Sequence, residues 1–240
     1  MFTREMKLAE AVQVNLNTLN VVIRFGIKLG FGDKSVQRVC EEYNVNTDFF
    51  LEILKAYHDP NYFPQKHLQS FSVKEIVEYL RKTHRNYIDD EIPYIEYHLN
   101  QMLRGCSYAK EIGLVHNLFT EYKQELFKHL SWEDEKIFPY AESIEKAFVG
   151  GQGSASIKEV ISAYSMTNFL ENHDDIESKL YDINTLFIKY LPPVKEQQLC
   201  LKILKNFSLL ESDLNNHSRI EEKVLAPKVI EMEKQLLTRI

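Results

Sequence analysis

The sequence has little glycine and little proline, 8 and 7 residues in 240, and almost no alternation of polar with apolar residues. Glycine and proline mark turns, and alternation is the pattern of a half-buried strand, so their scarcity disfavours a protein built from β-hairpins. Long stretches with an apolar residue at every third or fourth position lie between the few breakpoints. This period is typical of amphipathic helices. We therefore predict an all-α protein.

Cysteine is also scarce, and no apolar run is long enough to cross a bilayer. The three cysteines (Cys40, Cys106 and Cys200) are far apart and form no CxxC pair, which disfavours a disulfide framework and a thiolate zinc site. Residues 1–20 lack the continuous apolar core of a signal peptide. We expect reduced thiols in a cytoplasmic protein without a membrane partner.

An excess of basic residues is missing as well. Lys and Arg number 29 against 35 Asp and Glu, which gives a net charge of -6. Because binding to phosphates needs a basic face, we expect no nucleic-acid partner. Hydrophobic residues make up 44% of the chain, which is ample material for a buried core.

The breakpoints divide the chain into two predicted domains. Residues 1–60 form a small helical N-terminal domain, and 61–71 read as a linker. Residues 72–238 form an up-down-up-down four-helix bundle, opened by a capping box at Ser72 to Glu75. The predicted long helices cover about 72–103, 107–147, 156–190 and 194–238, the third opened by a capping box at Ser156 to Glu159. Pro93 lies inside the first of them and should kink it or mark a local defect.

Each predicted long helix carries one histidine on its apolar stripe. These are His84, His129, His173 and His217, and neighbours are 44 or 45 residues apart. Antiparallel helices of similar length would bring them to similar heights in the bundle. Glu133 and Glu221 follow two of them at i+4, on the same helix face. A single such histidine is more often a hydrogen-bonded core residue, but burying four imidazoles with two carboxylates is very costly unless a cation is bound.

The types of ligand restrict which metals the site can bind. A structural zinc site commonly has four ligands and often cysteine, while calcium and magnesium favour oxygen alone. Six nitrogen and oxygen ligands from four helices favour two transition metals bridged by carboxylates, and leave iron, manganese and zinc open. Free coordination positions could take dioxygen or nitric oxide.

No catalytic constellation is recognisable, so enzymatic activity stays open. His58, His67, His98 and His116 are expected at the surface or at helix ends, and Glu177 is either an acceptor that orients an imidazole or an exposed glutamate.

The two HxxxE segments resemble those of hemerythrin-like domains. The first is His129-Leu-Ser-Trp-Glu133-Asp-Glu-Lys-Ile-Phe-Pro139, and the second is His217-Ser-Arg-Ile-Glu221-Glu-Lys-Val-Leu-Ala-Pro227, with Ala226 where phenylalanine is usual. His84 and His173 resemble the first and third histidines of that family. The segments 24–35 and 39–42 are similar to the short domain that precedes the bundle in iron–sulfur cluster repair proteins, the repair-of-iron-centres family.

This resemblance implies a cytoplasmic non-haem di-iron protein that repairs iron–sulfur clusters under nitric oxide or oxidative stress, frequently as a homodimer. Damaged iron–sulfur proteins would be its partners. Two departures stand out: Gly30 and Phe31 occupy the places of a vicinal cysteine pair, and Asn172 stands where relatives often have glutamate. Thiol chemistry therefore does not carry over. The alternatives are a hemerythrin-like sensor or carrier of dioxygen or nitric oxide, and redox turnover of nitric oxide or peroxide.

Overall fold

The computed structural model describes residues 2–105, 109–150, 155–171, 176–190 and 196–238. Within these ranges every regular element is a helix, and the only β-type pairing is an isolated bridge between Lys7 and Ser35. The all-α prediction is confirmed. None of the described helices combines the length and the apolar character that spanning a membrane requires.

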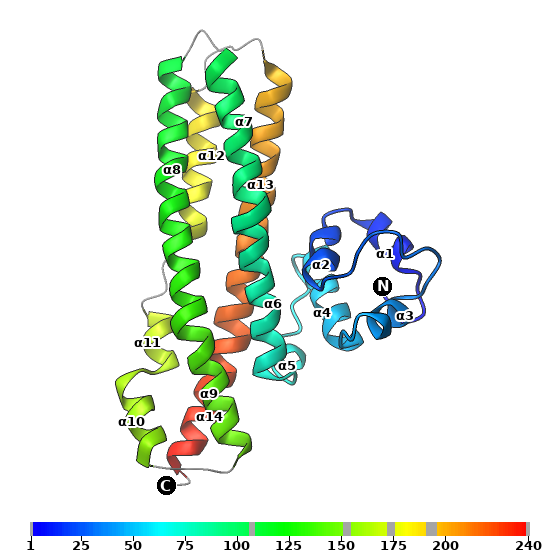
Figure 1. The fold of residues 1–240 in the computed structure, drawn as a ribbon, viewed down its shortest axis with the longest axis vertical. Coiled ribbons are helices and arrows are strands. Elements are labelled where there is room, and N and C mark those ends of the chain that lie inside the picture. Colours follow the sequence, from blue (N-terminus) through cyan, green and yellow to red (C-terminus); the bar gives the residue numbers. More distant parts are fainter. Residues whose placement is uncertain (1, 106–108, 151–154, 172–175, 191–195, 239–240) are drawn as a thin grey trace.

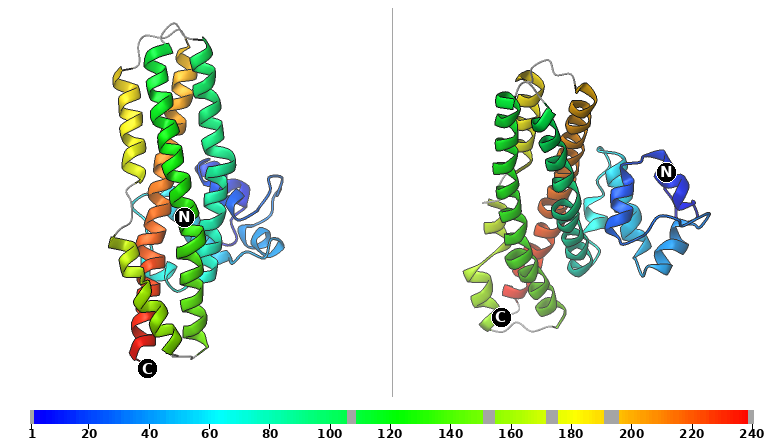
Figure 2. Two further views of the ribbon diagram at one scale, coloured as in Figure 1. Left: turned by 60° about the vertical axis from the view of Figure 1, so that its left-hand side comes forward. Right: turned by 45° about the horizontal axis from the view of Figure 1, so that its top comes forward.

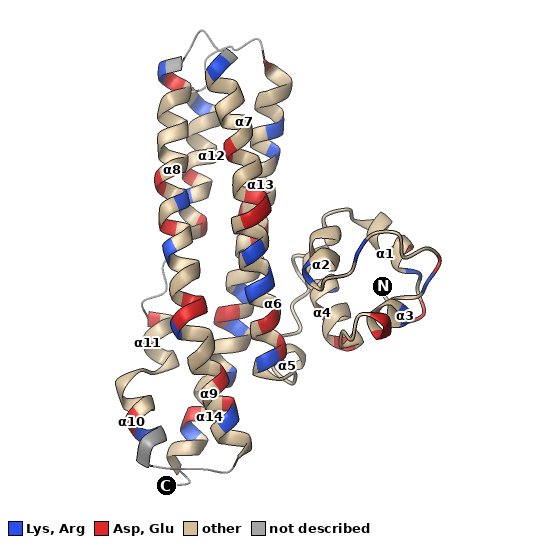
Figure 3. Ribbon diagram, in the orientation of Figure 1, with Lys and Arg blue, Asp and Glu red and all other residues tan. Residues whose placement is uncertain are grey.

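Four columns of helices run alternately up and down to form an elongated bundle (Figures 1 and 2). The first column is α6 (Val73–Asn86), η1 (Tyr87–Glu91) and α7 (Ile92–Gly105), and the second is α8 (Ala109–Trp132), η2 (Glu133–Ile137) and α9 (Phe138–Val149). The third is α10 (Ala155–Ala163), α11 (Met166–Glu171) and α12 (Ile176–Tyr190), and the fourth is α13 (Gln197–Ile220), η3 (Glu221–Leu225) and α14 (Ala226–Thr238). The predicted up-down-up-down bundle is confirmed. Lys and Arg are interspersed with Asp and Glu along the bundle helices (Figure 3).

The third column differs from its prediction as one helix over 156–190. The chain leaves helical geometry at Tyr164 and Ser165, and α11 begins anew at Met166. The buried carboxylate of Glu233, on α14, accepts hydrogen bonds from the Met166 backbone N–H at 2.9 Å and from the Tyr140 hydroxyl at 2.5 Å. A tertiary contact thus satisfies a backbone donor at the new helix start, which periodicity along one segment does not reveal. The side chain of Ser156 in the predicted capping box lies outside the described residues.

Three segments, η1, η2 and η3, are π-helical, and each begins six residues before a proline. In each, the N–H of the residue just before that proline donates to the carbonyl five residues back. A proline inside an α-helix lacks the N–H and crowds the carbonyl four residues earlier, and a π-turn absorbs this local conflict. The prolines are Pro93, Pro139 and Pro227. The local defect expected at Pro93 is present.

The apolar interior of the bundle consists of two clusters that meet near the π-helical segments. One cluster fills the half formed by α7, α8, α12 and α13, and includes Leu99, Phe119 and Phe207. The other fills the opposite half around α9 and α14, and continues into the N-terminal helices. The polar groups of the candidate site lie between these two clusters.

The N-terminal helices pack beside α6 and α13 (Figure 1). They are α1 (Leu8–Val14), α2 (Thr18–Arg24), α3 (Val36–Glu42) and α4 (Thr47–His58), followed by the short α5 (Gln65–Leu68). We refer to α1–α4 as the N-terminal unit. The ring of Phe25 lies 5.1 Å from that of Tyr79 on α6, so the apolar cores are continuous. The capping box at Ser72 is present, with both reciprocal hydrogen bonds to Glu75.

The turn at the departure from the cysteine pair has a structural role in this chain. Gly30 has φ of +94° and Gly32 has φ of +61°, in the left-handed region that glycine tolerates best. Phe31, between them, packs its half-buried ring against the apolar cluster that continues from α9 and α14 into the N-terminal helices. The turn therefore contributes packing to the core of the protein.

Candidate metal centre

Four side chains from three columns converge between the two apolar clusters. His84 lies in the last turn of α6 and His217 in the last turn of α13, while Glu133 and Glu221 are the first residues of η2 and η3. Nε2 of His84 lies 3.0 Å from Nε2 of His217 and 3.5 Å from a carboxylate oxygen of Glu133. Nε2 of His217 lies 3.1 Å from Oε1 of Glu221. One ligand atom from each of the four residues lies within 4.8 Å of all the others.

The cluster is buried. His84 and Glu133 have no exposed surface, and Glu221 and His217 are exposed by 1% and 2%. The ring of Phe138 stacks on the His84 imidazole at 5.2 Å, and the Tyr87 ring meets His217 edge-on at 5.8 Å. Aromatic rings therefore cover the imidazoles and separate them from bulk water.

Burial also sets the protonation of His217. Loss of solvation lowers the pKa of this imidazole to about 4, although the negative charges of Glu133 and Asp213 oppose that shift. The side chain is therefore neutral near pH 7, which is the form that binds metals through a nitrogen lone pair.

This donor set fits a bound cation. Two carboxylates that converge in an apolar interior repel each other and lose their solvation, and a cation offsets both costs. Imidazole nitrogen and carboxylate oxygen without a thiolate suit iron, manganese or zinc. The segments that carry the carboxylates are π-turns, which occur frequently at functional sites.

Comparison with known proteins agrees with this geometry. The sequence model of the hemerythrin HHE cation binding domain matches residues 75–229, which is more than half of the chain. The chain belongs to the hemerythrin HHE family. It is also 20% identical over 233 residues to the iron-sulfur cluster repair protein ScdA of Staphylococcus haemolyticus (strain JCSC1435), an alignment that covers 95% of this chain and 99% of that protein. As a member of the HHE family, the chain carries a cation-binding bundle, and the buried His/Glu cluster lies inside it.

Five of the six residues that the sequence analysis selected lie together in this hemerythrin-like bundle. Besides the four that converge, His129 places Nε2 3.2 Å from Oε1 of Glu133 and is 11% exposed on its side chain. The sixth, His173, lies outside the described residues. Its neighbour Asn172, one of the two departures from the repair proteins, lies outside them too.

Two residues near the cluster escaped the sequence analysis. Oδ1 of Asp134 lies 3.2 Å from Nδ1 of His84, where a carboxylate can orient an imidazole. Tyr87 begins η1 just as Glu133 begins η2, and both stand six residues before a proline. This shared distance from a proline could have indicated Tyr87 from the sequence alone. The contact of Asp134 with His84 could not be predicted in this way, because it depends on how α6 and η2 pack.

Two expectations about residues outside the main set have clear outcomes. The Ser218 hydroxyl, next to His217, donates a hydrogen bond to the half-buried carboxylate of Glu177, so Glu177 borders the candidate site. His98 was expected near the surface or a helix end, and this is wrong. It is 6% exposed, and the rings of Tyr94 and Tyr97 on the same helix contact its imidazole.

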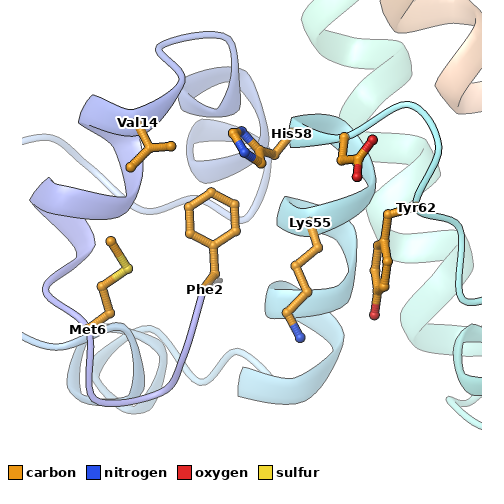
Figure 4. Close-up of a pocket in the computed structure, with 7 residues that line it drawn as sticks. Phe2, Met6, Val14, Lys55, His58 and Tyr62 are labelled. Carbon is orange, nitrogen blue, oxygen red and sulfur yellow. The ribbon is translucent and has the colours of Figure 1, made fainter.

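A separate pocket of about 270 Å³ lies in the N-terminal unit (Figure 4). Phe2, Met6 and Val14 line one part of it, and Lys55, His58 and Tyr62 line another. The Phe2 ring meets His58 edge-on at 5.0 Å. The pocket is formed by α1, α4 and the segments beside them, apart from the bundle interior that holds the His/Glu cluster.

Proposed function

We propose that His84, His129, Glu133, His173, His217 and Glu221 hold two iron ions, and that the chain is a non-haem di-iron protein of iron–sulfur cluster repair. The observation that carries this proposal is the convergence of two imidazoles and two carboxylates within 4.8 Å in a fully buried site. His129, on the same column as Glu133, and His173 supply the further ligands that a second metal needs. Manganese and zinc are the competing metals.

The similarity to ScdA, which extends over nearly the whole chain, supports the repair role. ScdA is named as an iron-sulfur cluster repair protein, and the alignment includes the N-terminal unit as well as the bundle. The partners of the present chain would then be proteins whose iron–sulfur clusters have been damaged by nitric oxide or oxidants. A pair of iron ions supplies redox activity and exchangeable coordination positions, and the protein side chains orient and shield them.

The surrounding side chains have distinct tasks in such a site. Glu133 and Glu221 bring negative charge, which neutralises the cations and permits bridging. The carboxylate of Asp134, with Oδ1 3.2 Å from Nδ1 of His84, would favour the imidazole orientation that directs Nε2 inward. The rings of Phe138 and Tyr87 exclude water.

A first experiment determines the metal. Protein purified without oxygen should contain two iron ions per chain by elemental analysis and give a Mössbauer spectrum of a coupled pair. One metal ion per chain, or zinc in place of iron, would contradict the di-iron proposal.

A second experiment tests repair. Iron-loaded protein is mixed with a hydro-lyase whose [4Fe–4S] cluster was damaged by nitric oxide or peroxide, and the recovery of hydro-lyase activity is followed. The iron-loaded protein should restore activity. Glu133→Ala protein should not, and neither should an equal amount of chelated iron without the protein. Equal recovery with the Glu133→Ala protein would overturn the repair function.

One observation favours a second candidate function, a sensor or carrier of dioxygen or nitric oxide. The four converging residues are at most 2% exposed, and so enclosed a site admits diatomic molecules more readily than it releases a metal ion. A spectrum that changes reversibly with dioxygen or nitric oxide, without iron loss and without repair activity, would favour this alternative.

A further inference from the structure

One buried guanidinium joins the N-terminal unit to the bundle. Arg24 is the last residue of α2 and is 2% exposed. Its Nη1 lies 2.8 Å from Oδ1 of Asp213 on α13, and its Nη2 bonds the second oxygen of the same carboxylate. Nη2 also donates to Oδ1 of Asn86 at 2.9 Å and to Oε1 of Glu91 at 3.3 Å. A single side chain of the N-terminal unit therefore links the first and fourth columns of the bundle.

The residues that Arg24 holds lie close in sequence to the two histidines of the cluster. Asn86 is two residues after His84, and Asp213 is one helical turn before His217. The guanidinium also lies 5.3 Å from the centroid of the Tyr87 ring, and this ring contacts His217. Arg24 thus cross-links the two columns whose histidines approach to 3.0 Å.

The cross-link lies at the one place in the first column where the helix is irregular. Asn86 precedes η1 and Glu91 ends it, so Arg24 is bonded to both ends of this π-turn. Tyr57, on α4, accepts a further hydrogen bond from Nη1 at 3.2 Å. Because a buried bidentate ion pair with additional hydrogen bonds has a fixed geometry, these contacts hold η1 and α13 at a set separation.

We propose that Arg24 is a positioning residue through which the N-terminal unit controls how firmly the bundle holds its metal. With Arg24 in place, η1 and α13 keep His84 and His217 converged. When the N-terminal unit moves away from the bundle, the cross-link is lost, the two columns can separate, and the metal is released. This inference rests on the proposed metal function and adds an opening step to the otherwise enclosed site.

The test compares four iron-loaded, full-length proteins: the wild type, Arg24→Met, Asp213→Leu and the double variant. Iron release to an excess of a coloured ferrous chelator is timed, and the urea midpoint of each protein is measured in parallel. Arg24→Met should release iron about 10- to 100-fold faster. This is the factor by which metal affinity commonly falls when a residue that supports the metal ligands is changed. It should also unfold at lower urea, because Asp213 is left buried without its partner.

The double variant separates positioning from stability. With Arg24 and Asp213 both replaced by apolar groups, its urea midpoint should return toward that of the wild type, because the Asp213 carboxylate is no longer buried without its partner. Its iron release should stay fast, because the cross-link is still missing. Release at the wild-type rate from the double variant would overturn the proposal.

Two control variants complete the design. Arg4→Met removes an exposed ion pair with Asp48 inside the N-terminal unit and should leave release unchanged. Ile144→Ala opens a cavity in the apolar cluster around α9 and α14, away from Arg24, and should lower the urea midpoint without faster release. If Ile144→Ala accelerates release as much as Arg24→Met, general loosening explains the effect and the proposal is wrong. Absence of bound metal in the wild type would instead overturn the proposed function, and this inference with it.

Discussion

Nε2 of His84 lies 3.0 Å from Nε2 of His217, although 133 residues separate them along the chain. Each histidine lies in the last turn of its α-helix, and a π-helical segment follows each of these helices. The two nitrogens share their surroundings with two buried carboxylates. A bound cation would give all four groups a common partner.

Removal of one carboxylate should abolish tight metal binding. Glu133→Ala and Glu221→Ala each delete a charged ligand atom from the cluster, so the iron content should fall at least about 10-fold. Glu135→Ala is the matched control, because Glu135 is exposed and bonded to Ser131 on the same helix. Elemental analysis of the purified proteins provides the measurement. A full iron content in both cluster variants would contradict the assignment.

Fluorescence should report on occupancy through Trp132, the single tryptophan of the chain. This residue directly precedes Glu133, is 37% exposed, and stacks on Phe169 at 5.9 Å. A metal with a partly filled d shell at Glu133 should quench its emission, whereas zinc, with a filled shell, should quench far less. Titration of metal-free protein with ferrous iron and with zinc tests this. Equal quenching by both ions, or none by iron, would count against a metal beside Glu133.

A substitution at Glu233 should lower the stability of the fold without changing metal binding. Glu233→Ala removes the acceptor for the Met166 N–H and the Tyr140 hydroxyl and leaves both donors buried without it. Two such losses should lower the free energy of unfolding by roughly 2–4 kcal/mol. Urea unfolding measures this change, and the iron content should stay at the wild-type level. Loss of iron at unchanged stability would show that Glu233 acts on the site instead.

The stability of the metal-free protein should depend on pH through Glu91. Burial raises the pKa of this carboxyl from its ordinary 4.5 to about 7, helped by the charges of Asp213 and Asp90 and opposed by Arg24. The folded protein therefore holds this proton more tightly than the unfolded chain. The stabilising contribution is complete below pH 4.5 and is lost as the pH rises through about 7.

The variant Glu91→Gln cannot ionise, so it isolates this effect. Between pH 4.5 and pH 8, its free energy of unfolding should gain on that of the wild type by up to about 3 kcal/mol. Urea unfolding of both proteins at the two pH values gives the comparison, in which all other titrating groups largely cancel. A difference that does not change with pH would contradict the raised pKa.

The helical pattern predicted much of the bundle because periodicity, capping residues and prolines are local signals. Ser72 with Glu75 opens a helix in isolation, and Pro93 disturbs one whatever surrounds it. The break at Tyr164 was missed, because the carboxylate that satisfies the next helix start belongs to Glu233 in a different column. His98 was also misplaced, since it is buried within α7 and not at the surface.

The sequence by itself predicted which side chains can serve the site. One histidine per helix on the apolar stripe, and a glutamate at i+4 after two of them, follow from the helical period alone. Only the tertiary structure decided how these groups meet. The approach of His84 to His217, the contact of Asp134 with His84 and the insertion of Arg24 beside Asp213 join distant segments, and their distances depend on how whole helices pack. Helix packing is fixed by many weak apolar contacts acting together, and no short motif records that sum.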